Sequence, residues 1–196
     1  MSMPLCGPPA DTASNEEWAN HVAELAKWES RTADSTLPQP QMVAPGIFLG
    51  GLHEAKDVAS LQERGVDCVL CLAPRECGPS AERYPKHWTT LDIEAEDELG
   101  YDIFEDDVPR AFKFLERCLG ECRAVFVHCV AGMNRSATVC AAWMLQSQGW
   151  PLCKVVQHLA VHRGLVLQNP SFNEGLVALA RAEEKLGGGP RDRYDY

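Results

Sequence analysis

The sequence contains no long apolar run and no excess of positive charge. No stretch approaches the roughly 20 apolar residues that a membrane-spanning helix needs, so we expect no membrane partner. The 18 Lys and Arg residues are outnumbered by 28 Asp and Glu residues, which gives a formal net charge of -10. This balance disfavours nucleic acid and anionic membranes as partners, although a local basic pocket could still exist.

The sequence also lacks a secretion signal and an acylation motif. The opening residues, Met1 to Leu5, do not form a signal peptide, and serine at position 2 argues against N-myristoylation. The chain has nine cysteines, an odd number, among 196 residues. We therefore expect free thiols in a reducing compartment, the cytosol or the nucleus.

The chain is long enough for one domain with a substantial core. Its hydrophobic content of 45% and charged content of 23% are ordinary for a soluble globular protein. It has no internal repeat and no indication of a second domain. We predict an N-terminal extension over residues 1–41, a main domain over residues 42–186 and a disordered tail over residues 187–196.

The N-terminal extension has one helical pattern, at about residues 15–31. Trp18, Val22, Leu25 and Trp28 recur there at spacings of four, three and three residues. We expect this apolar stripe to pack on the core of the protein. A helix that binds a partner protein is the alternative.

Apolar runs alternate with segments of helical spacing over the rest of the chain. The runs at 67–72 and 124–128 are typical of buried strands. Such alternation predicts an α/β fold with a mostly parallel central sheet flanked by helices. The other expected elements are short extended segments at 43–50, a strand at 88–93, and helices at 54–64, 109–119, 136–148, 151–162 and 169–186.

The most informative segment is residues 128–136, which read His-Cys-Val-Ala-Gly-Met-Asn-Arg-Ser. The segment lies between a predicted strand and a predicted helix, at the sheet edge where ligands bind in α/β proteins. The five residues between Cys129 and Arg135 suit a tight loop around one tetrahedral anion, with inward N–H groups and a helix N-terminus facing it. The predicted phosphate-binding residues are Val130, Ala131, Gly132, Met133, Asn134 and Arg135.

Cys129 is the predicted nucleophile, because helix N-termini and nearby cations favour thiolates. The planar, permanently charged fork of Arg135 is expected to bind two oxygens of a phosphoryl group. Ser136 is expected to donate a hydrogen bond to the sulfur, and His128 to orient the loop. The pattern therefore predicts transfer of a phosphoryl group onto sulfur.

A general acid has to come from another part of the chain, and an acidic segment follows the predicted strand at 88–93. A carboxylic acid there could protonate the leaving oxygen. Spacing alone does not choose among the candidates. These are Asp92, Glu94, Glu96, Asp97 and Glu98.

Over about residues 42–185 the chain resembles the cysteine-dependent dual-specificity protein phosphatases. The loop at 128–136, continued by Ala137-Thr138, carries most of this resemblance. The supporting segments are Ile47-Phe48-Leu49-Gly50, Ile93-Glu94-Ala95-Glu96-Asp97 and Asn169-Pro170-Ser171-Phe172, the last being a reordered form of the family's late Pro-Asn-x-x-Phe element.

The resemblance implies a small, atypical phosphatase with a protein tyrosine phosphatase-like fold and a catalytic domain over residues 42–186. It implies hydrolysis of phosphotyrosine and phosphoserine or phosphothreonine in phosphoproteins, through a phosphocysteine and without a metal or organic cofactor. The catalytic residues that it implies are Cys129, Arg135, Asp97 and Ser136. In this scheme Asp97 first protonates the leaving oxygen and later activates water. The sequence does not indicate an oligomeric state.

The loop between Cys129 and Arg135 contains no Lys, Arg or His. Relatives that act on inositol lipids or RNA ends tend to carry basic residues around this loop, so a phosphoprotein substrate is favoured. Three alternatives stay open. They are a phosphoprotein-binding scaffold with little turnover, a phosphatase for a non-protein phosphate ester, and a sulfur-transferring or arsenate-reducing protein.

Two cysteines in the predicted strand at 67–72 also need an interpretation. Cys68-x-x-Cys71 could be half of a zinc site, but no matching pair is evident and residues three apart in a strand point to opposite faces. We therefore expect no metal there. The family resemblance implies that Cys71 could form a disulfide with Cys129; a small core residue is the alternative.

Overall fold

The structure of the chain, a computed structural model, describes residues 8–31 and 39–187. Residues 1–7, 32–38 and 188–196 lie outside the described residues, so all but the first residue of the predicted tail at 187–196 is outside them. The elements, in chain order, are α1 (Asn15–Glu29), β1 (Gln41–Ala44), β2 (Ile47–Gly50), α2 (Leu52–Ala55), α3 (Val58–Glu63), β3 (Val66–Cys71), α4 (Pro74–Cys77), α5 (Ser80–Arg83), β4 (Thr89–Asp92), α6 (Asp107–Gly120), β5 (Ala124–His128), α7 (Arg135–Ser147), α8 (Leu152–Arg163) and α9 (Pro170–Ala182).

Five strands form one mixed sheet in the order β1-β2-β5-β3-β4. Strands β2, β5, β3 and β4 run parallel to one another, and β1 pairs antiparallel with β2. A turn at Pro45 and Gly46 makes this hairpin possible, since Gly46 has a φ of 73°. The predicted α/β fold with a mostly parallel sheet is confirmed.

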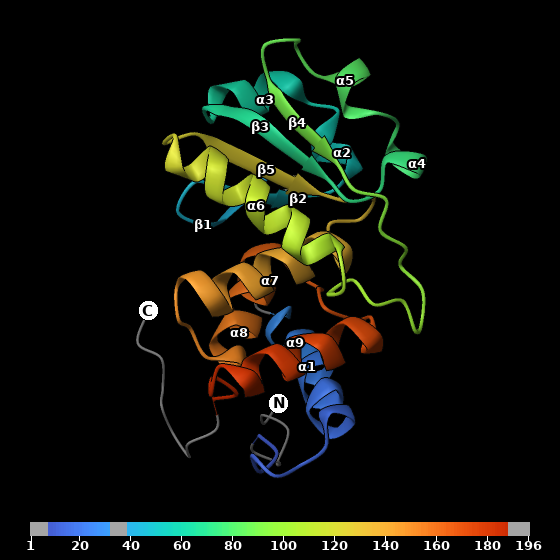
Figure 1. Cartoon of the computed structure of the whole chain (residues 1–196), viewed down its shortest axis with the longest axis vertical. Helices are drawn as coiled ribbons and strands as arrows, with labels where there is room; N and C mark the ends of the chain where they lie inside the picture. The colour runs from blue at the N-terminus through green and yellow to red at the C-terminus, as the bar shows by residue number, and fades with distance from the viewer. Residues whose placement is uncertain (1–7, 32–38, 188–196) are drawn as a thin grey trace.

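Helices cover both faces of the sheet (Figure 1). The short helices α2, α3 and α5 lie on one face, and the long helices α6 and α7 lie on the other. Side chains of β5 alternate accordingly: Val125 and Val127 belong to the larger core with the long helices, and Phe126 to the smaller core on the opposite face. The sheet is therefore the shared wall of two apolar cores.

Helix α1 packs against α8 and α9, far from the sheet (Figure 1). Its Trp18, Val22 and Leu25 are buried, which confirms the predicted packing of the apolar stripe on the core. Ser14 caps the helix, and its side chain accepts a hydrogen bond from the Glu17 N–H. The alternative, a helix that binds a partner protein, has no such support, because Trp18, Val22 and Leu25 are already buried within this chain.

The predicted helix at 54–64 is two short helices, α2 and α3. Asp57 separates them, because its carboxylate accepts a hydrogen bond from the Ser60 N–H at 3.0 Å and starts the second helix. The predicted helix at 169–186 ends at Ala182, shortly before Glu184 adopts a φ of 55°. The one-turn helices α4 and α5 were not predicted, because one turn is too short to show a period.

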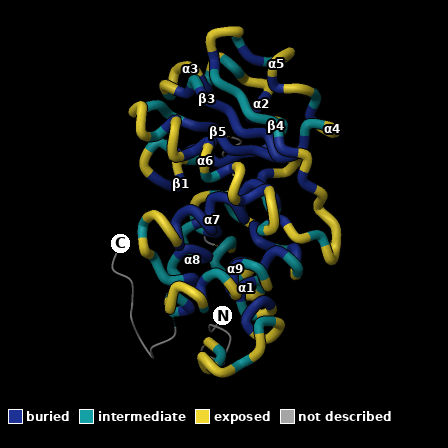
Figure 2. The backbone as a smooth tube through the Cα atoms, in the orientation of Figure 1, coloured by how far each residue is buried: buried dark blue, intermediate teal, exposed yellow. Residues whose placement is uncertain are grey.

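The parallel strands end at one edge of the sheet, and the loops that follow β3, β4 and β5 meet there. Figure 2 shows the strands as buried tubes that continue into partly exposed loops at this edge. Two backbone bonds hold the loops together: the Leu72 N–H donates to His128 O at 2.9 Å and the Ile93 N–H to Cys71 O at 2.8 Å. The carboxyl edge therefore gathers segments from three parts of the chain.

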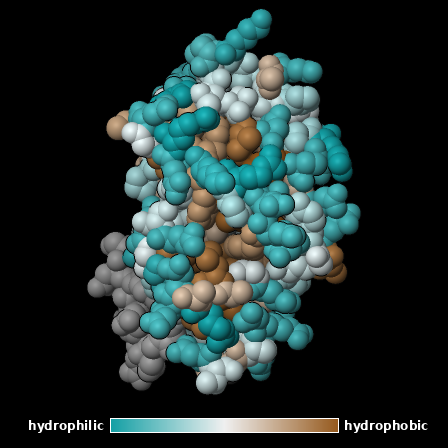
Figure 3. Space-filling view, viewed as in Figure 1, coloured by the Kyte–Doolittle hydropathy of each residue, from teal (hydrophilic) through white to brown (hydrophobic). Residues whose placement is uncertain are grey.

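The face of the molecule seen in Figure 3 is mainly polar. Figure 3 shows hydrophilic side chains over most of the viewed face, with small hydrophobic patches between them. Within residues 8–31 and 39–187, no helix combines the length and apolar composition that crossing a bilayer would require.

We predict that Trp18→Ala destabilises the protein by about 3–5 kcal/mol, the usual cost of emptying a large buried site. The Trp18 side chain is fully buried, and its indole N–H donates to Ala10 O at 3.0 Å. Trp28→Ala, on the partly exposed side of the same helix, should cost under about 1 kcal/mol. Urea unfolding followed by circular dichroism measures both, and equal costs would contradict the packing of α1.

Candidate active site

The loop at 129–134 curls around the sulfur of Cys129 at the end of β5. The Gly132 N–H donates to this sulfur at 3.3 Å, and the Ser136 hydroxyl donates to it at 3.2 Å. Cys129 is 1% exposed and Ser136 is fully buried. The sulfur therefore lies at the floor of the loop, with donors arranged around it.

Glycines allow the loop to approach the end of β2. Gly132 has a φ of 70°, and a Cβ there would lie 2.6 Å from the Gly50 backbone. A Cβ on Gly51 would lie 2.7 Å from Val130 O. The next residue, Leu52, donates its N–H to Val130 O at 2.8 Å. The backbone of the loop therefore packs directly against the backbone at the end of β2 and is hydrogen-bonded to the residues that follow it.

A buried ion pair supports the outer side of the loop. Arg163, the last residue of α8, donates from Nη1 to Glu54 Oε1 at 2.7 Å and from Nη2 to Ala131 O at 3.1 Å. The other Glu54 oxygen accepts from the Gly51 N–H at 2.9 Å. Burial acts to raise the pKa of Glu54, but the Arg163 charge and these hydrogen bonds outweigh it and lower the pKa. Glu54 thereby pairs with a cation that also contacts the loop backbone.

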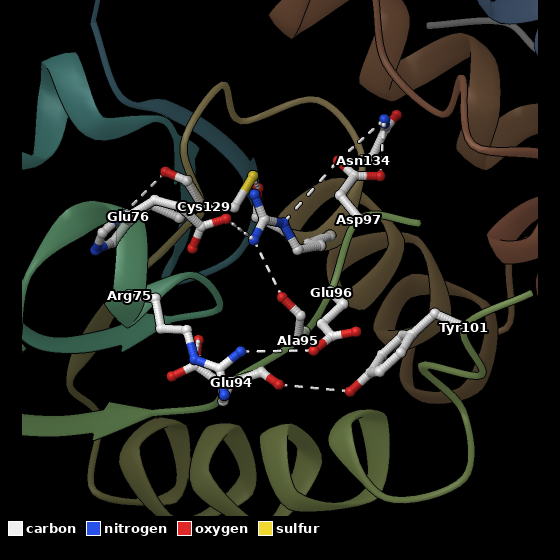
Figure 4. A network of polar contacts seen from close by, with 12 residues as sticks. Arg75, Glu76, Glu94, Ala95, Glu96, Asp97, Tyr101, Cys129 and Asn134 are labelled. Atoms are coloured by element: carbon white, nitrogen blue, oxygen red, sulfur yellow. Dashed lines mark hydrogen bonds and ion pairs between the residues drawn. The ribbon is translucent and has the colours of Figure 1, made fainter. Parts of the chain in front are cut away.

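Arg135 has a buried guanidinium group held by partners from two other loops. Its Nη1 donates to Glu76 Oε1 at 2.9 Å and to Ala95 O at 3.0 Å. Burial acts to lower the pKa of Arg135, yet the nearby Glu76, Cys129 and Asp97 charges raise it. In Figure 4 the side chain of Glu76 and the carbonyl group of Ala95 both reach this guanidinium, beside Cys129.

One donor of this guanidinium has no partner. Arg135 Nε is buried and makes no hydrogen bond with the described residues, although Asp97 Oδ2 lies 4.0 Å away. An unpaired buried donor is costly, particularly on a charged group. An oxyanion between the Cys129 sulfur and the guanidinium would satisfy it.

Asp97 lies beside Arg135 and is held by two amides. Asn134 Nδ2 donates to both Asp97 oxygens at 3.2 Å, and Asn169 Nδ2 donates to Oδ1 at 2.9 Å. Figure 4 shows Asp97 and Asn134 facing each other. The Asn134 side chain, from a residue predicted to bind phosphate, thus contacts Asp97, and its oxygen accepts from the Gln168 N–H at 2.9 Å.

Other candidate carboxylates have different partners. Asp92 accepts from the Ser80 N–H at 3.0 Å. The exposed Arg75 pairs with Glu94 at 3.2 Å and with Glu96 at 3.5 Å, contacts that solvent weakens. Of the acidic side chains left open by spacing, Asp97 is the one that the structure brings to Arg135.

His128 lies directly beneath the loop, where its Nδ1 is 3.2 Å from Cys129 O. The other ring nitrogen is 3.5 Å from the Tyr84 hydroxyl. The Cys71 and Cys77 thiols lie beside the ring. Interaction with Cys71 and His128 lowers the pKa of the Cys77 thiol, whereas interaction with Cys77 and burial raise the pKa of the Cys71 thiol. The disulfide between Cys71 and Cys129 stays a prediction.

These features coincide with one protein family. The sequence model described as "Dual specificity phosphatase, catalytic domain" matches residues 47–182. The chain therefore belongs to the dual specificity phosphatase family. The match begins at β2 and ends with α9, so it includes the sheet, the Cys129 loop and the segment that carries Asp97.

Individual dual specificity phosphatases are also similar to this chain in sequence. The chain is 31% identical over 144 residues to human "Dual specificity phosphatase 28", covering 72% of this chain and 78% of that protein. It is 29% identical over 144 residues to "Dual specificity protein phosphatase PHS1" of Arabidopsis thaliana, covering 73% of this chain. The chain spans only 15% of the length of that plant protein and under half of several other relatives.

A solved structure of a human DUSP28 variant has the same fold. Its TM-score is 0.66 at 26% sequence identity, and the match covers 76% of this chain and 98% of that chain. The protein tyrosine phosphatase-like fold implied by the family resemblance is therefore confirmed.

Several residues of the site were not predicted. Glu76 and Arg163 carry no local signal, since each is a single charge in a short or terminal helical turn. Asn169 was predicted from the Asn-Pro pair to start a helix, and its Oδ1 does accept from the Ser171 N–H at 3.0 Å. Its second contact, with Asp97, depends on the tertiary fold.

We predict that Glu54→Gln destabilises the protein by about 3 kcal/mol at pH 7, because it leaves Arg163 buried without a counter-charge. The folded-state pKa of Glu54 lies below its ordinary value of 4.5, so its contribution is present above pH 4.5 and is lost as the pH falls below that value. The difference between variant and wild type should shrink in acid.

Exposed Glu63→Gln, one helix away, is the matched control and should leave the unfolding free energy unchanged. Denaturant unfolding from pH 7 to pH 3 provides the measurement. A cost for Glu54→Gln that stays constant over this range would contradict the ion pair.

Proposed function

We propose that this protein is a dual-specificity protein phosphatase that acts through a phosphocysteine on Cys129. Arg135 binds the phosphoryl group, Asp97 is the general acid and Ser136 assists the sulfur. The N–H groups of residues 130–134 line the anion site. The catalytic domain covers residues 42–186, a range that includes the family match at 47–182. Catalysis needs neither a metal nor an organic cofactor.

The observation that carries this proposal is the convergence of three chemically distinct groups. The Cys129 sulfur accepts two hydrogen bonds at the floor of the loop, a buried Arg135 donor lacks a partner, and the Asp97 carboxylate lies 4.0 Å from that donor. A nucleophile, a cation and an acid around one anion-sized space are the parts that phosphate-ester cleavage requires.

In the first step, the Cys129 thiolate attacks phosphorus and the bond from phosphorus to the leaving oxygen breaks. Protonated Asp97 gives its proton to that oxygen, and the alcohol or phenol leaves. Arg135 binds equatorial oxygens, where its hydrogen bonds gain strength as the phosphoryl group becomes trigonal bipyramidal.

In the second step, the Asp97 carboxylate removes a proton from water, and the water oxygen attacks the phosphocysteine. The bond between phosphorus and sulfur breaks, and inorganic phosphate is released. The Ser136 hydroxyl, 3.2 Å from the sulfur, stabilises the departing thiolate.

The surroundings of the loop favour a phosphoprotein substrate. Side chains between Cys129 and Arg135 are uncharged, and the nearby Arg163 is neutralised by Glu54 at 2.7 Å. The exposed Glu94, Glu96 and Glu98 make the entrance acidic, so polyanionic lipids and RNA ends would be repelled. The proposed substrates are phosphotyrosine and phosphoserine or phosphothreonine in proteins.

The chain works in the cytosol or the nucleus. Support comes from the cysteines: all eight within the described residues are free, as a reducing compartment would keep them.

We predict that Asp97→Ala slows hydrolysis of a phosphotyrosine peptide by roughly 10²–10⁴-fold, the usual contribution of a general acid. Activity on p-nitrophenyl phosphate should fall less, because that leaving group needs little protonation. Cys129→Ser should abolish turnover of both substrates, whereas Cys129→Ala should retain phosphate binding. Vanadate should inhibit the wild type.

Phosphate release and peptide binding measured side by side separate this proposal from a scaffold. A wild-type protein that binds the phosphopeptide but releases no phosphate would support the scaffold instead. Turnover of a non-protein phosphate ester with no phosphopeptide turnover would identify the other alternative.

We predict that Asn169→Ser lowers kcat on the phosphotyrosine peptide roughly tenfold, a change of about 1.4 kcal/mol in the barrier. Serine keeps an acceptor for the start of α9 but removes the amide that donates to Asp97 at 2.9 Å. The same substitution in an Asp97→Ala background should have no further effect on kcat. A full tenfold loss in both backgrounds would show that Asn169 acts through something other than Asp97.

A further inference from the structure

Two thiols and an imidazole from three different elements gather behind the loop. They are Cys71 at the end of β3, Cys77 at the end of α4 and His128 at the end of β5. One ligand atom from each lies within 4.8 Å of the others. All three residues are buried, at 1%, 5% and 1% exposure. Among the residues that the structure describes, no other such group of three was found.

The hydrogen bond of His128 indicates which ring nitrogen is available to a metal. A carbonyl can only accept, so the contact between Nδ1 and Cys129 O at 3.2 Å places the proton of a neutral ring on Nδ1. Nε2 then carries the lone pair that a metal would use, and the Tyr84 hydroxyl now lies 3.5 Å from it. Histidine ligands of metals usually have this arrangement, in which the non-ligating nitrogen donates to a carbonyl or carboxylate.

We propose that Cys71, Cys77 and His128 form a binding site for one Zn²⁺ ion, separate from the phosphate site. Two thiolates and one imidazole are ligands that zinc prefers, and the ligand set is soft enough to disfavour magnesium and calcium. This site does not depend on the proposed phosphatase activity.

The distances are compatible with this ion. Zinc bonds of about 2.3 Å to sulfur and about 2.0 Å to nitrogen place tetrahedral ligands roughly 3.5–3.8 Å apart. The present separations, within 4.8 Å, therefore have to shorten by at most about 1.3 Å. The Tyr84 hydroxyl, 3.5 Å from His128 Nε2, lies near the position of a fourth ligand.

Charge also favours a divalent ion. Each thiol loses a proton as its sulfur bonds to the metal, so two protons are released and the pair of thiolates balances the charge of Zn²⁺. A neutral centre avoids the cost of burying an uncompensated charge.

Such an ion would connect two parts of the phosphate site. Cys77 is adjacent in sequence to Glu76, which binds Arg135 at 2.9 Å, and His128 contacts the carbonyl of Cys129. Zinc would tie the one-turn helix α4 to the sheet at the point where Glu76 has to be held. The ion would thus position Glu76 without contacting the substrate.

The test uses full-length Cys129→Ser protein, so that the loop thiol cannot bind metal. After reduction with a phosphine and dialysis against equimolar zinc, mass spectrometry under native conditions should find one zinc per chain, with two protons lost. Cobalt in place of zinc should give a near-ultraviolet thiolate-to-metal absorption band. Adding Cys77→Ser should abolish both signals. Adding Cys68→Ser, a buried thiol of the same strand, should leave them unchanged.

Failure to bind one zinc per chain, or equal binding after Cys77→Ser, would overturn the site. If the Cys77→Ser protein does not fold, the cobalt spectrum of the parent still decides, because a spectrum without the thiolate band rules out Cys71 and Cys77 as ligands. Phosphatase activity of the unmodified chain, measured separately, bears on the proposed function alone.

Discussion

The buried guanidinium of Arg135 is the constraint on which the arrangement of the carboxyl edge depends. A cation that is 6% exposed has to be compensated, and its partners come from outside its own loop. Glu76 reaches it from the segment after β3, and Ala95 O and Asp97 reach it from the segment after β4. The segments that follow β3, β4 and β5 therefore meet at the Arg135 guanidinium. This compensation leaves Arg135 Nε without a hydrogen bond to the described residues, and in the proposed function Nε binds the phosphoryl group.

The parts of the site that were predictable are those encoded by neighbours in sequence. The Cys129 loop could be recognised because the nucleophile, the arginine and the turn-forming Gly132 lie within seven positions. Alternating apolar runs likewise predicted the parallel sheet. The contacts of Glu76 with Arg135, Asn169 with Asp97 and Glu54 with Arg163 join residues 59, 72 and 109 positions apart. The spacing of residues along the chain does not indicate contacts over such separations. Asp97 itself was predicted from a family resemblance and not from spacing.

The cysteines also show that sequence spacing does not reveal contacts between distant parts of the chain. The two cysteines have different neighbours: the Cys68 thiol lies 3.5 Å from Asp67 Oδ1, and the Cys71 thiol lies within 4.8 Å of ligand atoms of Cys77 and His128. The expectation of no metal was drawn from linear spacing in this one strand. Parallel pairing of Cys71 with His128, and the return of α4 toward the sheet, bring together ligands that no motif contains. A zinc-bound Cys71 would also be withheld from a disulfide with Cys129.

The side-chain amide of Asn169 contacts both the start of α9 and the Asp97 carboxylate. Its oxygen begins α9, and its nitrogen holds the Asp97 carboxylate. Fraying of the first turn of α9 would therefore release Asp97 while the sheet is still intact. On heating, such a protein would lose its acid-dependent rate before its global unfolding transition. The C-terminal helix would then set the temperature range in which the protein works.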